Sequence, residues 1–335
     1  MNERPLKAIQ QIQLGTVLST EQQARETLGR LERAGFEGIE LNGFMTRPTP
    51  LFVRALTRAS GMPVGRGGRL DWPELIRSTS LKVVGLHEDL GTVEREPDAV
   101  ISRAASFDTR RVVITGMHRF DYTDEAQVRD LALRLNAAGR VLAAGNVSLL
   151  YHNHNVEFRR LPSGRTAFSV LIAETDPSAV NFEFDCYWPT AAGVDALALM
   201  RELGERVVLC HITDRGTRRR GSSLTPIDEA DAVELGLGNM DIPSFIEQAK
   251  LSGTRAVILE THRNWIEGSP IRSFETSAKV LNRHLGQHSP LRPAATERGA
   301  PRTEHVRTSE GPCWTASDPP RSRRPLRPIA KAPHG

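Results

Sequence analysis

The sequence predicts an α/β barrel built from eight strand–helix units. Eight short runs rich in Val, Ile, Leu or Phe recur along the first 285 or so residues, and most are followed by a helical pattern. This alternation indicates a parallel sheet, and about 285 residues is the usual size of such a barrel. Acidic and histidine residues end several of the runs, where a barrel gathers its active site.

The expected strands are spread evenly along the chain. They lie near Ile9–Thr16, Gly38–Leu41, Lys82–His87, Arg111–Thr115, Val147–His152, Val180–Asp185, Val207–Thr213 and Arg255–Glu260. A doubly wound sheet is the alternative, but no glycine-rich dinucleotide fingerprint follows the first strand.

Boundary signals mark several of the helices. Thr20 with Gln23 forms a capping-box pattern, and Gly35 is expected to end the helix that it begins. Thr123 could cap a second helix, and Asp241 opens a third that has proline in its first turn.

Three regions lack a regular pattern. Residues 43–80 and 214–241 are expected to contain long loops, the second lying over the barrel mouth. Residues 287–335 are rich in Pro, Arg, Ser, Thr and Ala and cannot form a core, so we expect a disordered tail. The catalytic domain is therefore expected to span residues 1–286.

Composition limits the classes of function. The 335 residues are 39% hydrophobic and 25% charged, and no apolar run is long enough to cross a membrane. Three cysteines form no disulfide framework and the first residues show no signal region, so a cytoplasmic location is expected. The net charge is +4, but residues 290–335 carry nine Lys/Arg against four Asp/Glu, which leaves −1 for the rest. A nearly neutral body argues against nucleic-acid binding.

Three residues at strand ends carry the chemical prediction. Asp185, His211 and Glu260 each follow a short apolar run. A carboxylate buried at such a position is costly unless it is paired, hydrogen-bonded or bound to metal. A helix cap for Asp185 and a core histidine for His211 are the alternatives. Together, ligands from successive strand ends favour one divalent metal.

The fifth strand leaves its contribution open. His152 and His154 alternate along it and therefore share one face, and Glu157 follows at its end. One of the three is expected to complete the metal site and another to contact substrate. Glu157 is preferred as ligand, because a second carboxylate beside Glu260 would suit proton transfer.

Weaker candidates surround this set. His87 and Glu40, at the ends of the third and second strands, and Asp214, just after His211, are expected to contact substrate, as are the fifth-strand histidines. His118 and His262 read as loop residues. The run Arg218–Arg220 is expected to be a solvated loop, with phosphate binding as the less favoured reading.

Four stretches carry a resemblance to a known family. They are Gly35-Phe-Glu-Gly-Ile-Glu-Leu41, Tyr151-His-Asn-His-Asn-Val-Glu-Phe158, Phe184-Asp-Cys-Tyr-Trp-Pro-Thr-Ala-Ala-Gly193 and Gly236-Leu-Gly-Asn-Met-Asp-Ile-Pro243. Over residues 9–285 the chain resembles the sugar phosphate isomerase/epimerase family. These are xylose isomerase-like barrels, which also include inosose dehydratase and the endonuclease IV type of repair enzyme.

The resemblance implies a metal-dependent enzyme. It implies Asp185, His211 and Glu260 as ligands, with Glu157 or a fifth-strand histidine as the fourth. Manganese suits such mixed carboxylate and imidazole ligands best, with cobalt, magnesium or zinc as alternatives. The expected reaction is isomerisation or epimerisation of a sugar or sugar phosphate through an enediolate. Glu260 and Glu157, or a histidine of the fifth strand in place of Glu157, would exchange the proton. An inosose dehydratase-like lyase and a non-catalytic sugar-binding barrel are the rivals.

Two departures from the family pattern stand out. The family often has His-x-Lys-Asp where this chain has His211-Ile-Thr-Asp214, and Gly-Glu-Gly-Asn where Leu237 here replaces the glutamate. The partner expected is a small sugar or polyol, with neither nucleic acid nor membrane, and the chain is a possible homo-oligomer.

Overall fold

The computed structural model describes residues 4–48, 67–117, 119–218 and 225–286. Outside this part lie the tail expected over 287–335, His118, residues 49–66 of the first expected loop, and residues 219–224 of the expected mouth loop, which include Arg219 and Arg220. The expected division between a catalytic domain and a tail therefore stays a prediction.

Eight parallel strands close into a barrel in the order β1-β10-β7-β6-β5-β4-β3-β2. The strands are β1 (Leu6–Gln10), β2 (Gly38–Asn42), β3 (Lys82–Glu88), β4 (Arg111–Thr115), β5 (Ser148–His152), β6 (Val180–Asp185), β7 (Val207–Ile212) and β10 (Ala256–Leu259). Every pairing around the ring is parallel. The predicted fold class is confirmed.

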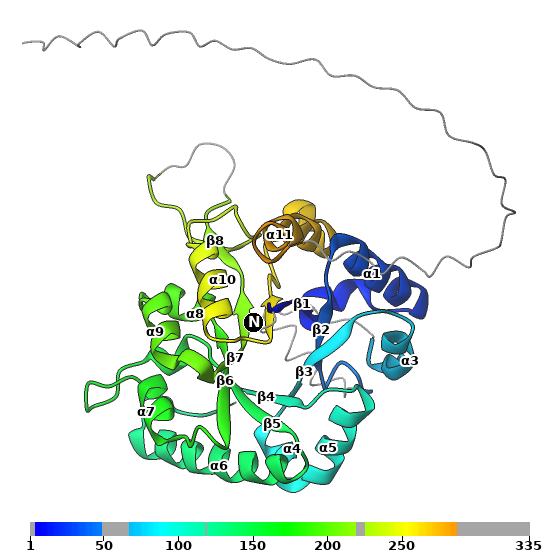
Figure 1. The fold of residues 1–335 in the computed structure, drawn as a ribbon. Helices are drawn as coiled ribbons and strands as arrows, with labels where there is room; N and C mark the ends of the chain where they lie inside the picture. Colours follow the sequence, from blue (N-terminus) through cyan, green and yellow to red (C-terminus); the bar gives the residue numbers. More distant parts are fainter. Residues whose placement is uncertain (1–3, 49–66, 118, 219–224, 287–335) are drawn as a thin grey trace, which may run out of the picture. The chain divides into compact units, whose positions relative to one another are not determined.

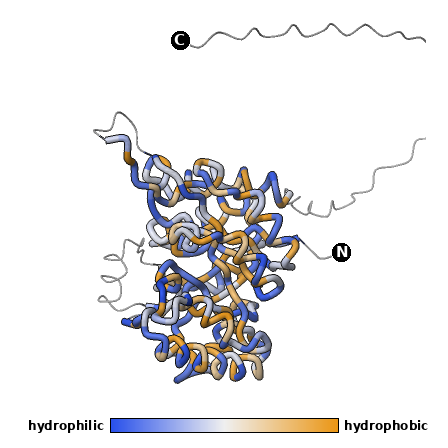
Figure 2. The backbone as a smooth tube through the Cα atoms, turned by 90° about the vertical axis from the view of Figure 1, so that its left-hand side faces the viewer, coloured by the Kyte–Doolittle hydropathy of each residue, from blue (hydrophilic) through white to orange (hydrophobic). Residues whose placement is uncertain are grey.

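Helices surround this ring of strands on the outside (Figure 1). They are α1 (Glu21–Ala34), α3 (Trp72–Arg77), α4 (Leu90–Arg95), α5 (Pro97–Ser106), α6 (Glu125–Ala144), α7 (Ala167–Glu174), α8 (Tyr187–Ala191), α9 (Ala196–Leu203), α10 (Ile242–Leu251) and α11 (Pro270–Leu285). Hydrophilic and hydrophobic segments alternate along the outer helices, as expected of helices with one buried face (Figure 2).

The prediction for the first strand was wrong in its position. The strand is Leu6–Gln10, and Gln11–Val17 forms a 3₁₀ helix, η1. Because β1 contains Lys7, its sequence does not read as an apolar run. Lys7 is nevertheless buried, and its ammonium donates to Asn282 Oδ1 and to the carbonyl of Gly286, both at 2.7 Å.

Two of three predicted helix starts are confirmed. Thr20 Oγ1 accepts from the amide of Gln23, and Gly35 ends the helix with φ at 95°. Asp241 caps α10. The third start was one residue off, because Asp124 accepts from the first amides of α6 and the Thr123 hydroxyl donates to Asp121 instead.

Two apolar clusters fix the barrel. The larger one lies between the strands and the helices. The smaller one fills the interior and consists of Ala8, Val84, Val113, Leu150, Leu209, Ala256 and Ile258. This interior plug closes the barrel below the level at which its polar residues begin.

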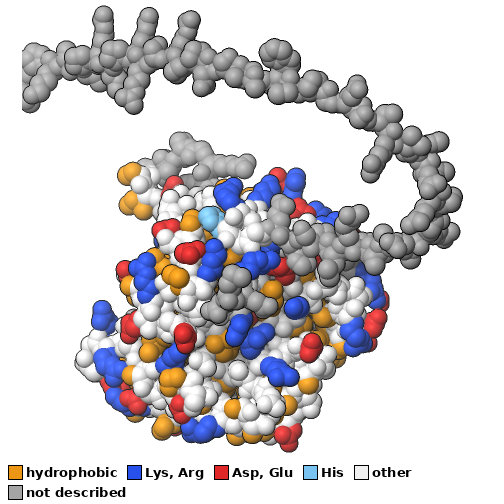
Figure 3. Space-filling view, viewed as in Figure 1, with side chains coloured by type: hydrophobic (Ala, Val, Ile, Leu, Met, Phe, Trp, Pro, Cys, Tyr) orange, Lys and Arg blue, Asp and Glu red, His pale blue; other side chains and the backbone are white. Residues whose placement is uncertain are grey.

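The two long loops contain some secondary structure. Residues 214–241 include an antiparallel pair, β8 (Asp214–Gly216) with β9 (Asp231–Val233), and residues 43–80 include α3. No helix among the described residues is long and apolar enough to cross a membrane. On the face that Figure 3 shows, basic and acidic side chains are interspersed and form no single-sign patch.

Candidate metal centre

Strand alternation puts a polar layer directly above the apolar plug. Side chains two residues apart on a strand point to the same side. Leu150 and Leu209 belong to the plug, so His152 and His211, two residues further on, also face the barrel interior. Both histidines are buried. The same spacing puts Glu183 and Asp185 of β6 on one face.

Four side chains from adjacent strands meet near the carboxyl ends of the strands, and we call them the outer group: His152, Asp185, His211 and Glu260. One ligand atom from each lies within 4.8 Å of all the others. His211 Nδ1 is 3.0 Å from Glu260 Oε2 and 4.0 Å from Asp185 Oδ2. Two nitrogen and two oxygen donors at this spacing fit a divalent metal.

Asp185 combines the two roles that the sequence left open. Its Oδ1 accepts from the backbone amides of Tyr187, at 2.7 Å, and Trp188, at 3.2 Å, and so caps α8. Its Oδ2 is the oxygen that faces His211. The cap therefore fixes the carboxylate in the orientation that points one oxygen into the outer group.

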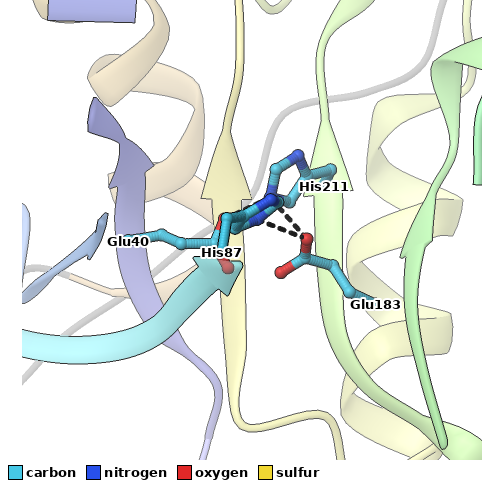
Figure 4. A group of neighbouring side chains, drawn as sticks. All are labelled: Glu40, His87, Glu183 and His211. Carbon is cyan, nitrogen blue, oxygen red and sulfur yellow. Dashed lines mark hydrogen bonds and ion pairs between the residues drawn. The ribbon is translucent and has the colours of Figure 1, made fainter. Parts of the chain in front are cut away.

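A second set lies deeper, and we call it the inner group: Glu40, His87, Glu183 and His211 (Figure 4). His87 Nε2 is 3.1 Å from Glu40 Oε2 and 3.0 Å from Glu183 Oε2. His211 Nε2 is 2.6 Å from the same oxygen of Glu40. His211 thus belongs to both groups, with Nδ1 facing outward and Nε2 inward.

Charge compensation makes the inner group stable in the barrel interior. Burial alone would lower the pKa of His87, but the charges of Glu40 and Glu183 outweigh it and raise the pKa to about 10. Burial would likewise raise the pKa of Glu183, but His211 and His87 hold it well below its usual range. At neutral pH, His87 is therefore a cation beside ionised Glu183.

The outer group carries perturbed pKa values of its own. Burial opposes a charge on His211, yet Glu183, Glu40 and Glu260 raise its pKa well above the ordinary value. Burial raises the pKa of Asp185 to about 6. The pKa of Glu260 is held low by His211 despite burial, so Glu260 is ionised at neutral pH. Strongly perturbed groups that converge in this way are typical of functional sites.

Aromatic rings flank the outer group. The centroid of the His154 ring is 4.8 Å from that of His152 and 5.8 Å from that of Trp188. Trp188 in turn stacks on His262, with ring centroids 6.4 Å apart and an angle of 29° between the planes. Burial and the neighbouring His152 lower the pKa of His154 to about 3, so this imidazole is neutral. Such aromatic rings can pack against the apolar surface of a small-molecule ligand.

Glu157 belongs to neither of the two groups of possible metal ligands. It lies in η3 (Val156–Phe158), the 3₁₀ turn after β5. Its Oε1 accepts from the Tyr151 hydroxyl at 2.7 Å, and Oε2 accepts from the His154 amide at 2.9 Å. Tyr151 alternates with His152 and therefore faces the helices. Glu157 thus holds the turn that carries His154, and His152 takes the place in the outer group that was expected of Glu157.

Substituting Glu157 by glutamine is expected to destabilise the fold without removing a bound metal. The amide leaves one of two buried hydrogen bonds poorly made, which costs about 1–3 kcal/mol in urea unfolding. Metal content measured on the same folded variant should equal that of the wild type. Loss of metal at unchanged stability would return Glu157 to the ligand set.

Of the other residues predicted to contact substrate, some belong to the inner group and others have structural roles. Glu40 and His87 lie in the inner group. The Asp214 carboxylate has a structural role, since it accepts from the amides of Arg215, Gly236, Gly238 and Met240, and its contact with substrate stays a prediction. Arg218 is paired with buried Glu234.

Two residues of the site were missed in the sequence. Glu183 had a readable signal, because it shares a strand face with Asp185 in Asn181-Phe-Glu-Phe-Asp185. Trp188 had a weaker one, since its place beside His154 depends on how α8 begins.

The fold and these groups define a barrel with its polar site at the carboxyl ends of the strands. The profile of the xylose isomerase-like TIM barrel family matches residues 28–284, and the chain belongs to this family. No curated protein matches the chain.

Solved structures share the fold at low identity. A sugar phosphate isomerase/epimerase from Parabacteroides distasonis ATCC 8503 is 20% identical, with a TM-score of 0.65 over 84% of this chain and 94% of that one. A probable 3-DHS dehydratase, AsbF, from Bacillus anthracis is 14% identical, with a TM-score of 0.60 over 83% and 98%. The IOLI protein, solved with a zinc atom, is 12% identical, with a TM-score of 0.57 over 84% and 98%.

Proposed function

We propose that this chain is a divalent-metal-dependent isomerase or epimerase of a sugar or polyol. The observation that carries the proposal is the convergence of His152, Asp185, His211 and Glu260 in the barrel of a xylose isomerase-like protein. The neighbour named sugar phosphate isomerase/epimerase and the zinc in another neighbour agree with this chemistry.

The outer group would hold the metal, which supplies Lewis-acid polarisation of a substrate carbonyl when bound. Manganese is our preferred ion because oxygen and imidazole donors are balanced in the group. The inner group offers a similar donor set but is less accessible, since the side chains of Glu40, Glu183 and His211 are fully buried. Glu260, whose side chain is 12% exposed, opens the outer group to substrate.

Two groups are proposed to transfer a proton. Glu260 is ionised and can take the proton from the carbon beside the substrate carbonyl. Neutral His154, next to His152, is the second group proposed: its N–H would give a proton to the resulting enediolate while its other ring nitrogen takes one from water. Trp188 and His262 would exclude water from one side of the sugar.

Metal binding is expected to release about one proton at pH 7, because His211 is protonated in the metal-free protein and must give up the proton on its ligating nitrogen. Because the pKa of His211 is raised, protons compete with the metal for this residue, and metal affinity should fall about tenfold for each unit by which the pH is lowered. Below pH 6 the dependence should steepen, since Asp185 with a pKa of about 6 also becomes protonated. Calorimetry in two buffers with different ionisation heats measures the number of protons released per metal ion bound. A value near zero at pH 7 would contradict the prediction.

Turnover in deuterated water tests the reaction itself. Ketoses, their 3-epimers and inososes would be incubated with the manganese-loaded protein and analysed by mass spectrometry and NMR. Deuterium at the carbon beside the carbonyl, without loss of water, is the expected result. A product lighter by one water would instead identify a lyase, for which the same acid–base pair would serve. Metal-independent binding without turnover would identify a sugar-binding barrel.

A further inference from the structure

The two histidines of the outer group each have a carboxylate behind them. His152 Nδ1 lies 2.9 Å from Glu183 Oε2, and His211 Nε2 lies 2.6 Å from Glu40 Oε2. An imidazole that donates one N–H to a carboxylate leaves its other nitrogen unprotonated and oriented as a metal ligand. The nitrogens that would face the metal are Nε2 of His152 and Nδ1 of His211, and the second of these lies 3.0 Å from Glu260 Oε2 in the metal-free protein.

His87 explains how both carboxylates can be buried together. Its Nε2 stands about equally far from Oε2 of Glu40 and of Glu183, at 3.1 and 3.0 Å. By angle neither contact is an aligned hydrogen bond, and Nε2 has no hydrogen-bond partner among the described residues. The two contacts are therefore ion pairs, and they leave Oε2 of each carboxylate available to accept from a histidine of the outer group.

The donors around Glu40 support the same assignment. Its Oε2 also accepts from Gln10 Nε2 at 2.9 Å, and Gln10 Oε1 accepts from Asn42 Nδ2 at 2.7 Å and from the Ile12 amide at 3.2 Å. This chain of hydrogen bonds fixes the orientation of the Glu40 carboxylate. A carboxylate held in this way can select one tautomer of the imidazole that it faces.

We propose that Glu183 and Glu40 are positioning residues that hold His152 and His211 in the tautomers which offer Nε2 and Nδ1 to the metal. In this role the inner group binds no cation of its own, because His87 already occupies the space between its two carboxylates. The inference rests on the proposed function, since it assigns a task toward the metal of the outer group.

Cobalt titration of the intact chain tests this role without relying on activity. Co²⁺ gives visible bands that report its coordination, and equilibrium dialysis gives stoichiometry and affinity. Wild type should bind one Co²⁺. Glu183→Gln and Glu40→Gln should bind one Co²⁺ about tenfold more weakly, and Glu183→Ala about 100-fold more weakly, with altered visible bands. The amide of glutamine keeps an acceptor but loses the charge, so a graded loss is the expected pattern.

Glu37→Gln is the matched control. Glu37 is also a buried carboxylate in an ion pair, with Arg4 at 2.7 Å, but it precedes β2 at the amino-terminal end of the barrel. Its Co²⁺ affinity and spectrum should equal those of wild type. Circular dichroism of each variant confirms that it is folded, and Glu40→Gln serves if Glu183→Ala does not fold.

Three results would overturn the inference, and they separate it from the proposed function. Unchanged affinity and bands in both glutamine variants would remove the positioning role while leaving the metal site intact. A second Co²⁺ in wild type that Glu40→Gln abolishes would make the inner group a metal site. No Co²⁺ bound to wild type would overturn the proposed function as well.

Discussion

Substituting Asp185 by asparagine is expected to remove the bound metal while leaving the barrel folded. Asparagine keeps an oxygen that can accept from the Tyr187 and Trp188 amides, so the start of α8 survives. It loses the charged ligand that faces His211. We expect activity to fall about 10³-fold or more, since a metal supplies several kcal/mol of transition-state stabilisation. Metal content by mass spectrometry and turnover rate measure the two effects.

Asp195→Asn provides the matched control for this change. Asp195 caps α9 by accepting from the Ala198 amide at 2.9 Å, which is the same structural task, and it does not belong to the outer group. This variant should keep its metal and its rate. If Asp185→Asn also kept both, Asp185 would be only a helix cap.

Substituting Asp214 by alanine is expected to produce the largest loss of stability among single changes near the site. The carboxylate is buried and accepts from four backbone amides, three of which belong to residues 236–240. Removing it leaves buried donors without partners, and hydrogen bonds to a charged group are worth about 1.5–3 kcal/mol each. We expect a loss of about 3 kcal/mol or more in the free energy of unfolding, measured in urea.

The contrast with asparagine sharpens this prediction. Asp214→Asn keeps one acceptor oxygen and should lose less stability than alanine does. A raised KM at wild-type stability in both variants would support the original expectation that Asp214 contacts substrate.

The strand ends were predictable because apolar runs mark parallel strands and because chemistry collects where those strands end. Asp185, His211 and Glu260 were found in this way, and the structure brings all three together. His152 was found as an alternative, since two-residue alternation gave it the same face as His154. The position of a residue along a strand therefore carried most of the information about the site.

The errors came from places where side-chain contacts overrule the local pattern. Lys7 made a buried strand look polar, because its partners at the end of α11 are far away in sequence. Glu157 lies in the 3₁₀ turn after β5, and the alternation of a strand does not predict where side chains of that turn point. Its carboxylate accepts a hydrogen bond from the buried Tyr151 hydroxyl. Glu183 was not predicted because it lies two residues before the end of β6, where no strand-end signal marks it.

Anomalous scattering at the manganese edge, from crystals grown with Mn²⁺, tests the central claim most directly. The account predicts one peak within about 2.3 Å of His152 Nε2, His211 Nδ1 and the facing oxygens of Asp185 and Glu260. A peak between Glu40, His87 and Glu183 instead, or no peak at saturating Mn²⁺, would contradict it.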